Sequence, residues 1–235
     1  MHHAPIVGSP ELSEFAAFFR APDQRLLSAW FYGKHLWGAM PSWETKIART
    51  ATTPRQFAEF PGVASCYTKM LQNCGCSSHV MTAAEIASEN AEREGGRPSN
   101  LRAGVHRCGG GPRGKHLWLG PRAARAAARR VLEFRFVGIT ELWHASVCLW
   151  HRRVGAGAGP RADELAMYRV GSHRASNASG YDARLLDGYV DREDELVYAA
   201  ALRRFEDDLD DALGYARAPR EPLPFDDAAP GGARA

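Results

Sequence analysis

Arg20 and Ser28 are the residues of this chain whose types and spacing point most directly to chemistry. Arg20 follows the apolar, aromatic run 14–19, which reads as a buried strand, and Pro22 suits the first turn of a helix that carries Ser28. A guanidinium group donates two parallel hydrogen bonds to paired phosphate oxygens, and a helix N-terminus favours the same negative charge. The segment therefore predicts a site for one phosphate, although an arginine at a strand end is more often an ordinary surface residue.

The pattern around these two residues resembles a known nucleotide-binding motif. Segment 20–31 reads R-x-P-x-x-R-x-x-S-A-W-F. It is similar to the 3′-phosphate-binding motif of the sulfotransferases that use 3′-phosphoadenosine 5′-phosphosulfate (PAPS), particularly the Golgi glycan type that includes uronyl 2-O-sulfotransferases. The resemblance implies that Arg20 and Ser28 grip the 3′-phosphate of PAPS and that Arg25 supports them.

Further segments follow in the order found in that family. Segment 66–71, C-Y-T-K-M-L, is similar to the helix after the motif, and 136–146 resembles the family's F-V-G-[IL]-T-E-x-x-x-x-S strand and helix. Segment 173–179 loosely matches a basic loop that contains N-x-S and closes over the nucleotide. The resemblance therefore implies that Arg174 and Asn177 contribute to the nucleotide site.

The reaction that the resemblance implies is transfer of a sulfuryl group from PAPS to a hydroxyl group of a carbohydrate acceptor. The acceptor hydroxyl needs a base, and histidine suits this task because its pKa of ~6.5 lies near the operating pH. The resemblance implies a histidine base upstream of the 3′-phosphate motif. Only His2 and His3 precede that motif, and His3 is the expected base. PAPS is the expected co-substrate, and no metal is expected. The alternative is a catalytically inactive relative that binds nucleotide or anionic glycan.

One part of the family pattern has no counterpart here. The family holds the 5′-phosphosulfate with a strand–loop–helix at its N-terminus, and no such segment precedes residue 20. We therefore expect either an N-terminally incomplete chain or a degenerate relative. The resemblance also implies the Golgi lumen as the location, with membrane attachment only through an anchor upstream of Met1.

The elements that must position these residues predict an α/β fold. Strands are expected over 14–19 and 134–139, and the expected helices cover 24–37, 53–72 with an interruption, 82–93, 123–130, 141–150 and 191–215. The resemblance refines this to a P-loop-NTPase-like, three-layer domain with a mostly parallel sheet. The domain is expected over 1–218, with a Gly/Arg-rich loop or insertion over 94–122 and a disordered tail over 219–235.

Composition limits the classes of function. The chain has 235 residues, 45% of them hydrophobic, and a formal net charge of +3. This mild positive charge suits an anionic ligand but does not indicate nucleic-acid binding. No run of about 18 apolar residues is present, so no segment of the sequence is expected to span a membrane.

The cysteines suggest a metal site only superficially. Five cysteines leave at least one thiol unpaired within the chain. Three of them join His79 in the pattern C-x7-C-x-C-x2-H over 66–79. Structural zinc sites usually have C-x2–4-C pairs, so we expect free buried thiols or one disulfide instead.

Two rival functions depend on the segment 97–130. Its basic residues suit a non-catalytic protein that binds anionic glycans. Separately, 109–115 fits the G-x-x-x-x-G-K pattern of a phosphate loop, and hence a kinase, but His116 stands where that loop has Ser or Thr. The segment before it, 102–108, is not expected to be a buried strand. A flexible, glycine-rich insertion is the simpler interpretation.

Overall fold

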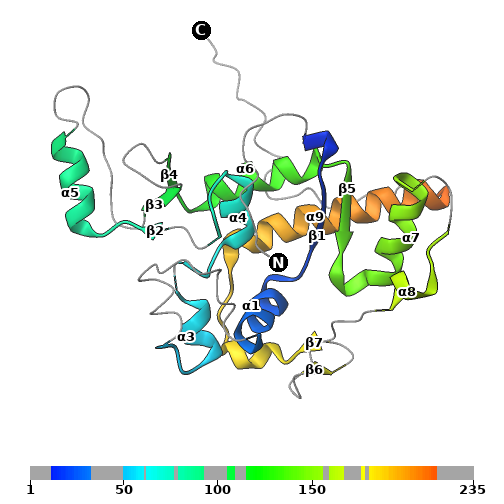
Figure 1. The fold of residues 1–235 in the computed structure, drawn as a ribbon, viewed down its shortest axis with the longest axis horizontal. Helices are drawn as coiled ribbons and strands as arrows, with labels where there is room; N and C mark the ends of the chain where they lie inside the picture. The colour runs from blue at the N-terminus through cyan, green and yellow to red at the C-terminus, as the bar shows by residue number, and fades with distance from the viewer. Residues whose placement is uncertain are drawn as a thin grey trace, which may run out of the picture.

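The computed structural model describes residues 12–32, 50–60, 62–76, 79–92, 105–108, 115–155, 159–166, 176–177 and 180–215. These residues form an α/β fold with a small parallel central sheet and many helices (Figure 1). In chain order the elements are η1 (Leu12–Glu14), β1 (Ala16–Phe19), α1 (Pro22–Phe31), α3 (Pro54–Ala58), α4 (Cys66–Leu71), β2 (His79–Val80), α5 (Ala83–Glu92), β3 (Val105–Cys108), β4 (Lys115–Trp118), α6 (Pro121–Leu132), β5 (Phe136–Ile139), η2 (Thr140–Leu142), α7 (Trp143–Arg153), α8 (Ala162–Leu165), β6 (Ser176–Asn177), β7 (Gly180–Tyr181), η3 (Ala183–Leu186) and α9 (Arg192–Leu213).

The parallel pair β1 and β5 forms the centre of the fold (Figure 1). The register places Phe19 opposite Ile139, so both strands end at the same edge. All four residues of β5 are buried. Gly138 is required opposite Phe18, because a Cβ atom there would lie 2.6 Å from the Phe18 ring. This edge is where ligands bind in open parallel sheets.

The long helix α9 supports the sheet from one side and runs beside α6 (Figure 1). The alanines of α6 let the two helices approach closely, and Ala128 packs directly on Ala200. Asp191 caps the start of α9, and Gly214 ends it at φ +74°, a conformation that favours glycine. The fully or nearly buried residues of this main core are Phe19, Leu71, Ala127, Val131, Phe134, Phe136, Val137, Ile139, Leu149, Val197, Ala201 and Phe205.

A second apolar cluster fixes the helix that follows β1. Leu26 and Leu27 of α1 are almost completely buried against Phe57 of α3 and Leu186 of η3. Two successive leucines in one turn give α1 a broad buried face. The packing of α1 on α3 and η3 therefore fixes where α1 lies after β1.

Most of the predicted elements are confirmed. Strands 14–19 and 134–139 correspond to β1 and β5, and the helices predicted over 123–130 and 191–215 correspond to α6 and α9. Thr82 and Glu85 form a capping box before α5. The Glu85 N–H donates to the Thr82 hydroxyl at 3.2 Å, and the Thr82 N–H donates to the Glu85 carboxylate at 2.8 Å.

The segment 94–122, expected as a Gly/Arg-rich loop or insertion, contains regular secondary structure. Residues 105–108 and 115–118 form the antiparallel pair β3–β4, which β2 extends to three strands, and α6 begins at Pro121. The Cys74–Cys108 disulfide and the burial of Leu117 anchor this small sheet. Strands of four residues rich in basic side chains give too little alternation to be recognised in a sequence.

Two further points concern the C-terminal tail and the possibility of a membrane-spanning helix. The tail predicted over 219–235 lies outside the described residues. In the part of the chain that the structure describes, no helix combines the length and the apolarity needed to cross a membrane.

Candidate functional site

Arg20 and Glu141 meet at the edge where the two parallel strands end. Arg20 follows β1, and Glu141 follows β5 in the first turn of η2. The Arg20 Nε atom lies 3.9 Å from Glu141 Oε1, which also accepts the Ala21 N–H at 3.0 Å. The Tyr198 hydroxyl of α9 lies 3.4 Å from the other carboxylate oxygen of Glu141. One carboxylate therefore links both strand ends to α9.

Tyr67 of α4 fixes the backbone of Arg20. Its hydroxyl accepts the Arg20 N–H at 3.0 Å and donates to the Arg20 carbonyl at 3.1 Å. Burial raises the pKa of Tyr67 to about 12, so the hydroxyl keeps its proton near neutral pH. The strand end therefore has both of its backbone polar groups satisfied by one side chain.

The Arg20 side chain has the properties of an anion ligand. It is 30% exposed, and its guanidinium carbon lies 5.5 Å from the centre of the Tyr181 ring. Its Nε atom is buried and has no hydrogen-bond partner in the described structure. A buried donor without a partner is costly, whereas a phosphate oxygen would satisfy it. This edge therefore presents a partly exposed guanidinium with one donor that has no hydrogen-bond partner among the described residues.

The hairpin β6–β7 docks on α1 beside Arg20. Gln24 accepts the Tyr181 N–H at 2.7 Å and donates to the Tyr181 carbonyl at 3.0 Å. Gly180 has φ +115°, and a Cβ atom there would lie 2.5 Å from Gln24 Oε1, so only glycine fits. Asn177 pairs with Gly180 in this hairpin. The backbone of the predicted closing residue Asn177 is thus tied to the helix that carries Ser28.

The N-terminus of α1 offers less to an anion than the sequence predicts. Pro22 has no N–H, the Ala21 N–H donates to Glu141, and the Gln24 N–H donates to Asp23 at 2.7 Å. Carboxylates of the chain therefore already accept two of the backbone N–H groups at this end, those of Ala21 and Gln24. A phosphate here depends on side chains, and the predicted contribution of the helix terminus is largely taken up.

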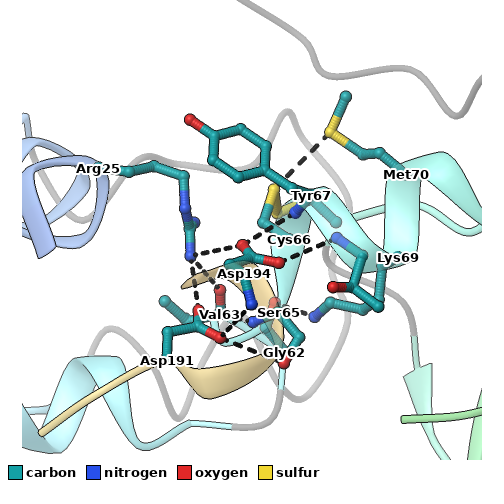
Figure 2. Close-up of a disulfide and its surroundings, with 12 residues drawn as sticks. Arg25, Gly62, Val63, Ser65, Cys66, Tyr67, Lys69, Met70, Asp191 and Asp194 are labelled. Atoms are coloured by element: carbon teal, nitrogen blue, oxygen red, sulfur yellow. Dashed lines mark hydrogen bonds and ion pairs between the residues drawn. A yellow bond between two sulfur atoms is a disulfide. The ribbon is translucent and has the colours of Figure 1, made fainter. Parts of the chain in front are cut away.

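Arg25 extends toward a buried acidic pair, Asp191 and Asp194 (Figure 2). Its guanidinium lies 3.0 Å from Asp191 and 3.4 Å from Asp194, and only 10% of its side chain is exposed. Asp194 also accepts the backbone N–H groups of Tyr67 at 3.0 Å and Thr68 at 2.9 Å. Arg25 therefore joins α1 to the starts of α4 and α9.

One carboxyl group of this junction, that of Asp194, has a raised pKa. Burial and the neighbouring charge of Asp191 raise the pKa of Asp194 to about 6, while Arg25 and the two backbone donors act in the opposite direction. On α4, Lys69 is also fully buried, with Nζ 3.3 Å from the Gly62 carbonyl (Figure 2). Lys69 therefore does not reach solvent, although the charged ends of lysine side chains usually do.

Two disulfides account for the cysteine cluster. Cys66 pairs with Cys76, and Cys74 pairs with Cys108, while Cys148 is a free, exposed thiol. The expectation of free thiols or one disulfide is therefore wrong by one bond. The C-x7-C-x-C-x2-H pattern failed to reveal this because Cys108 lies 34 residues from its partner. Within the described ranges, no group of His, Cys, Asp or Glu side chains is arranged to hold a metal ion.

The remaining predicted residues fall into two groups. Ser28 lies on α1 and is partly exposed, and among the described residues no hydrogen bond joins it to Arg20. His3 and Arg174 lie outside the described residues. The proposed phosphate loop 109–115 connects the antiparallel strands β3 and β4, which does not match the strand-to-helix geometry of a P-loop.

A hollow of about 280 Å³ lies on another side of α1. Its lining includes the carboxylates of Asp23, Asp191 and Glu195 together with apolar residues of η3 and α1. Asp191 is paired with Arg25, but Asp23 and Glu195 line the hollow and its lining, among the described residues, contains no arginine or lysine, so it is a poor candidate for the nucleotide site.

Comparisons with known protein families, with curated proteins and with solved structures find no match for this chain.

Five residues contribute contacts at the site although the sequence did not predict a role for them. They are Gln24, Tyr67, Glu141, Tyr181 and Tyr198. For Glu141 a signal existed, since it follows a buried strand at nearly the position that Arg20 has after its own strand. Tyr67 and Tyr181 act over separations of 47 and 157 residues, which no local pattern encodes.

Proposed function

We propose that this chain is a sulfotransferase-like domain whose reaction transfers a sulfuryl group from PAPS to a hydroxyl group of a carbohydrate. In this proposal the β1–β5 pair belongs to a P-loop-NTPase-like, three-layer sheet. Arg20 and Ser28 hold the 3′-phosphate of the nucleotide. PAPS supplies the sulfuryl group, and His3 takes the proton from the acceptor hydroxyl.

The observation that carries the proposal is the state of Arg20. Its backbone is fixed by Tyr67, its guanidinium is held between Glu141 and Tyr181, and its Nε donor has no partner in the described structure. Such a side chain is oriented in advance, is only weakly paired with Glu141, and lacks a hydrogen-bond acceptor at Nε. A nucleotide phosphate supplies the missing acceptor.

The other predicted residues take different roles in the proposal. Arg25 acts as a positioning residue, because its guanidinium is engaged by Asp191 and Asp194. Asn177 and Arg174 close over the nucleotide, and the hairpin that contains Asn177 is tied to α1 by Gln24.

The disulfides support the proposed location. Disulfides persist in oxidising compartments and are rare in the cytosol. The Cys66–Cys76 and Cys74–Cys108 bonds therefore favour the secretory pathway, which agrees with a role in the Golgi lumen.

Calorimetric titration with 3′-phosphoadenosine 5′-phosphate tests the proposal. Arg20→Ala and Ser28→Ala should each weaken binding by ~1.5–3 kcal/mol, because each removes a donor to a charged phosphate. Arg161→Ala is the control, since that side chain is 72% exposed and pairs with an acid on its own segment. Folded variants that bind as tightly as the wild type would exclude Arg20 and Ser28 as phosphate ligands.

A further inference from the structure

The exposed face of α6 carries a row of arginines. The helix reads P-R-A-A-R-A-A-A-R-R-V-L and contains no acidic residue. Arg122 and Arg129 are exposed and Arg125 is partly exposed. Spacings of three and four residues bring these side chains onto one face of a helix. The buried face is made of Ala124, Ala127, Ala128 and Val131.

These three arginines carry charges that the protein does not neutralise. Arg130, the fourth arginine of α6, donates to the Leu71 carbonyl at 2.6 Å and so has a structural role. Arg122, Arg125 and Arg129 take part in none of the ion pairs or side-chain hydrogen bonds formed among the described residues. Glu133, one turn beyond Arg129, is exposed and makes no ion pair with it either.

The helix that carries these three arginines is packed firmly against the rest of the fold. The opposite face of α6 packs on α9, with Ala128 against Ala200, and Arg130 ties the same helix to α4. At ~1.5 Å per residue, the first and last of the three arginines are separated by ~10 Å along the helix axis. A row of fixed cations of that length suits an extended polyanion better than a single phosphate group.

We propose that this arginine face, formed by Arg122, Arg125 and Arg129, binds an acidic polysaccharide. Proteins that bind single-stranded nucleic acids combine cations with aromatic platforms for the bases, and α6 has no aromatic residue. The two disulfides favour an oxidising compartment, where acidic polysaccharides are the common polyanions. The arginine face is formed by α6 alone, so its binding of a polysaccharide does not depend on whether Arg20 binds a nucleotide.

The test compares two variants that lose the same charge. One carries Arg122→Gln, Arg125→Gln and Arg129→Gln, and its matched control carries Arg161→Gln, Arg184→Gln and Arg192→Gln, which are exposed arginines on other elements. Heparin is the probe, and its affinity is measured at several salt concentrations. We expect the α6 variant to bind at least about tenfold more weakly, with a salt dependence lower by about three ions, because each cation in contact releases about one counterion. The control should stay within about twofold of the wild type.

Equal losses in both variants would overturn the proposal, since net charge alone would then explain binding. Tighter binding of duplex DNA than of heparin through the same three arginines would overturn the choice of polysaccharide. If the triple variant is less stable, the double variant Arg122→Gln and Arg129→Gln replaces it, because it changes only the two exposed side chains. Its heparin affinity is then compared with that of a control that carries two of the three control substitutions. A titration with 3′-phosphoadenosine 5′-phosphate should be unchanged in all of these variants.

Discussion

The guanidinium of Arg20 lies between a carboxylate and an aromatic ring, and each has a separate effect on anion binding. The Tyr181 ring restricts the orientation of the guanidinium without neutralising it. Glu141, at 3.9 Å, is close enough to attract the same group but too far for a hydrogen bond. An incoming phosphate must therefore compete with Glu141 for Arg20.

This competition predicts the effect of Glu141→Gln. The substitution removes the competing charge and keeps an oxygen that accepts the Ala21 N–H. Partly exposed ion pairs contribute about 0.2–1 kcal/mol, so 3′-phosphoadenosine 5′-phosphate should bind a few-fold more tightly. Calorimetry beside the wild type measures this. Binding weakened tenfold would instead mean that the Glu141 charge is needed to orient Arg20.

At the scale of elements, a buried acidic junction holds α1, α4 and α9 together. Asp194 accepts two backbone donors at the start of α4, and Asp191 caps α9 and accepts the Ser65 N–H at 2.8 Å. Arg25 supplies the cation between these two acids. Removing one partner of a buried pair leaves an uncompensated charge, so Arg25→Ala should cost ~3–5 kcal/mol of unfolding free energy.

The raised pKa of Asp194 makes the stability of this junction depend on pH. The folded-state value of about 6 exceeds the ordinary value of ~3.9, so the folded protein binds more protons than the unfolded chain between these limits. The contribution of Asp194 is therefore fully present below about pH 4 and is lost as the pH rises through about 6. Urea unfolding from pH 4.5 to 7 should show this loss in the wild type and not in Asp194→Asn. Glu133→Gln, at the exposed end of α6, should behave as the wild type, and identical profiles for Asp194→Asn and the wild type would contradict this account.

The elements differ in how far their sequence reveals them. Strands β1 and β5 and helix α9 have dense, periodic apolar residues, so their positions follow from local pattern. The strands β3 and β4 carry basic residues and depend on pairing and on the Cys74–Cys108 bond, so local pattern misses them. The position of Arg20 could be predicted from its strand, but its contacts with Tyr67 and Tyr181 arise only when distant segments pack.

For the whole molecule, the disulfides connect the small antiparallel sheet to the main core. The Cys74–Cys108 bond joins residues 34 apart and ties β3 to the segment after α4. Closing a loop of this length is expected to contribute ~4 kcal/mol in the chain-entropy model. The paired substitution Cys74→Ser and Cys108→Ser should lower the free energy of unfolding by about that amount. Cys148→Ser, which changes the free exposed thiol, should have little effect, and equal stability of both variants would argue against a structural role for the bond.

The central claim is that Arg20 recognises the 3′-phosphate of a nucleotide, and a thermodynamic cycle tests it most directly. The affinities of wild type and Arg20→Ala are measured for 3′-phosphoadenosine 5′-phosphate and for adenosine 5′-monophosphate, which lacks the 3′-phosphate. We predict that loss of the 3′-phosphate weakens binding to the wild type by about 10- to 100-fold and barely affects Arg20→Ala. The reason is that Arg20→Ala has already lost the charge-assisted contact that the wild type makes with this phosphate. Equal affinity of the wild type for both nucleotides, or the same loss in both proteins, would contradict the claim.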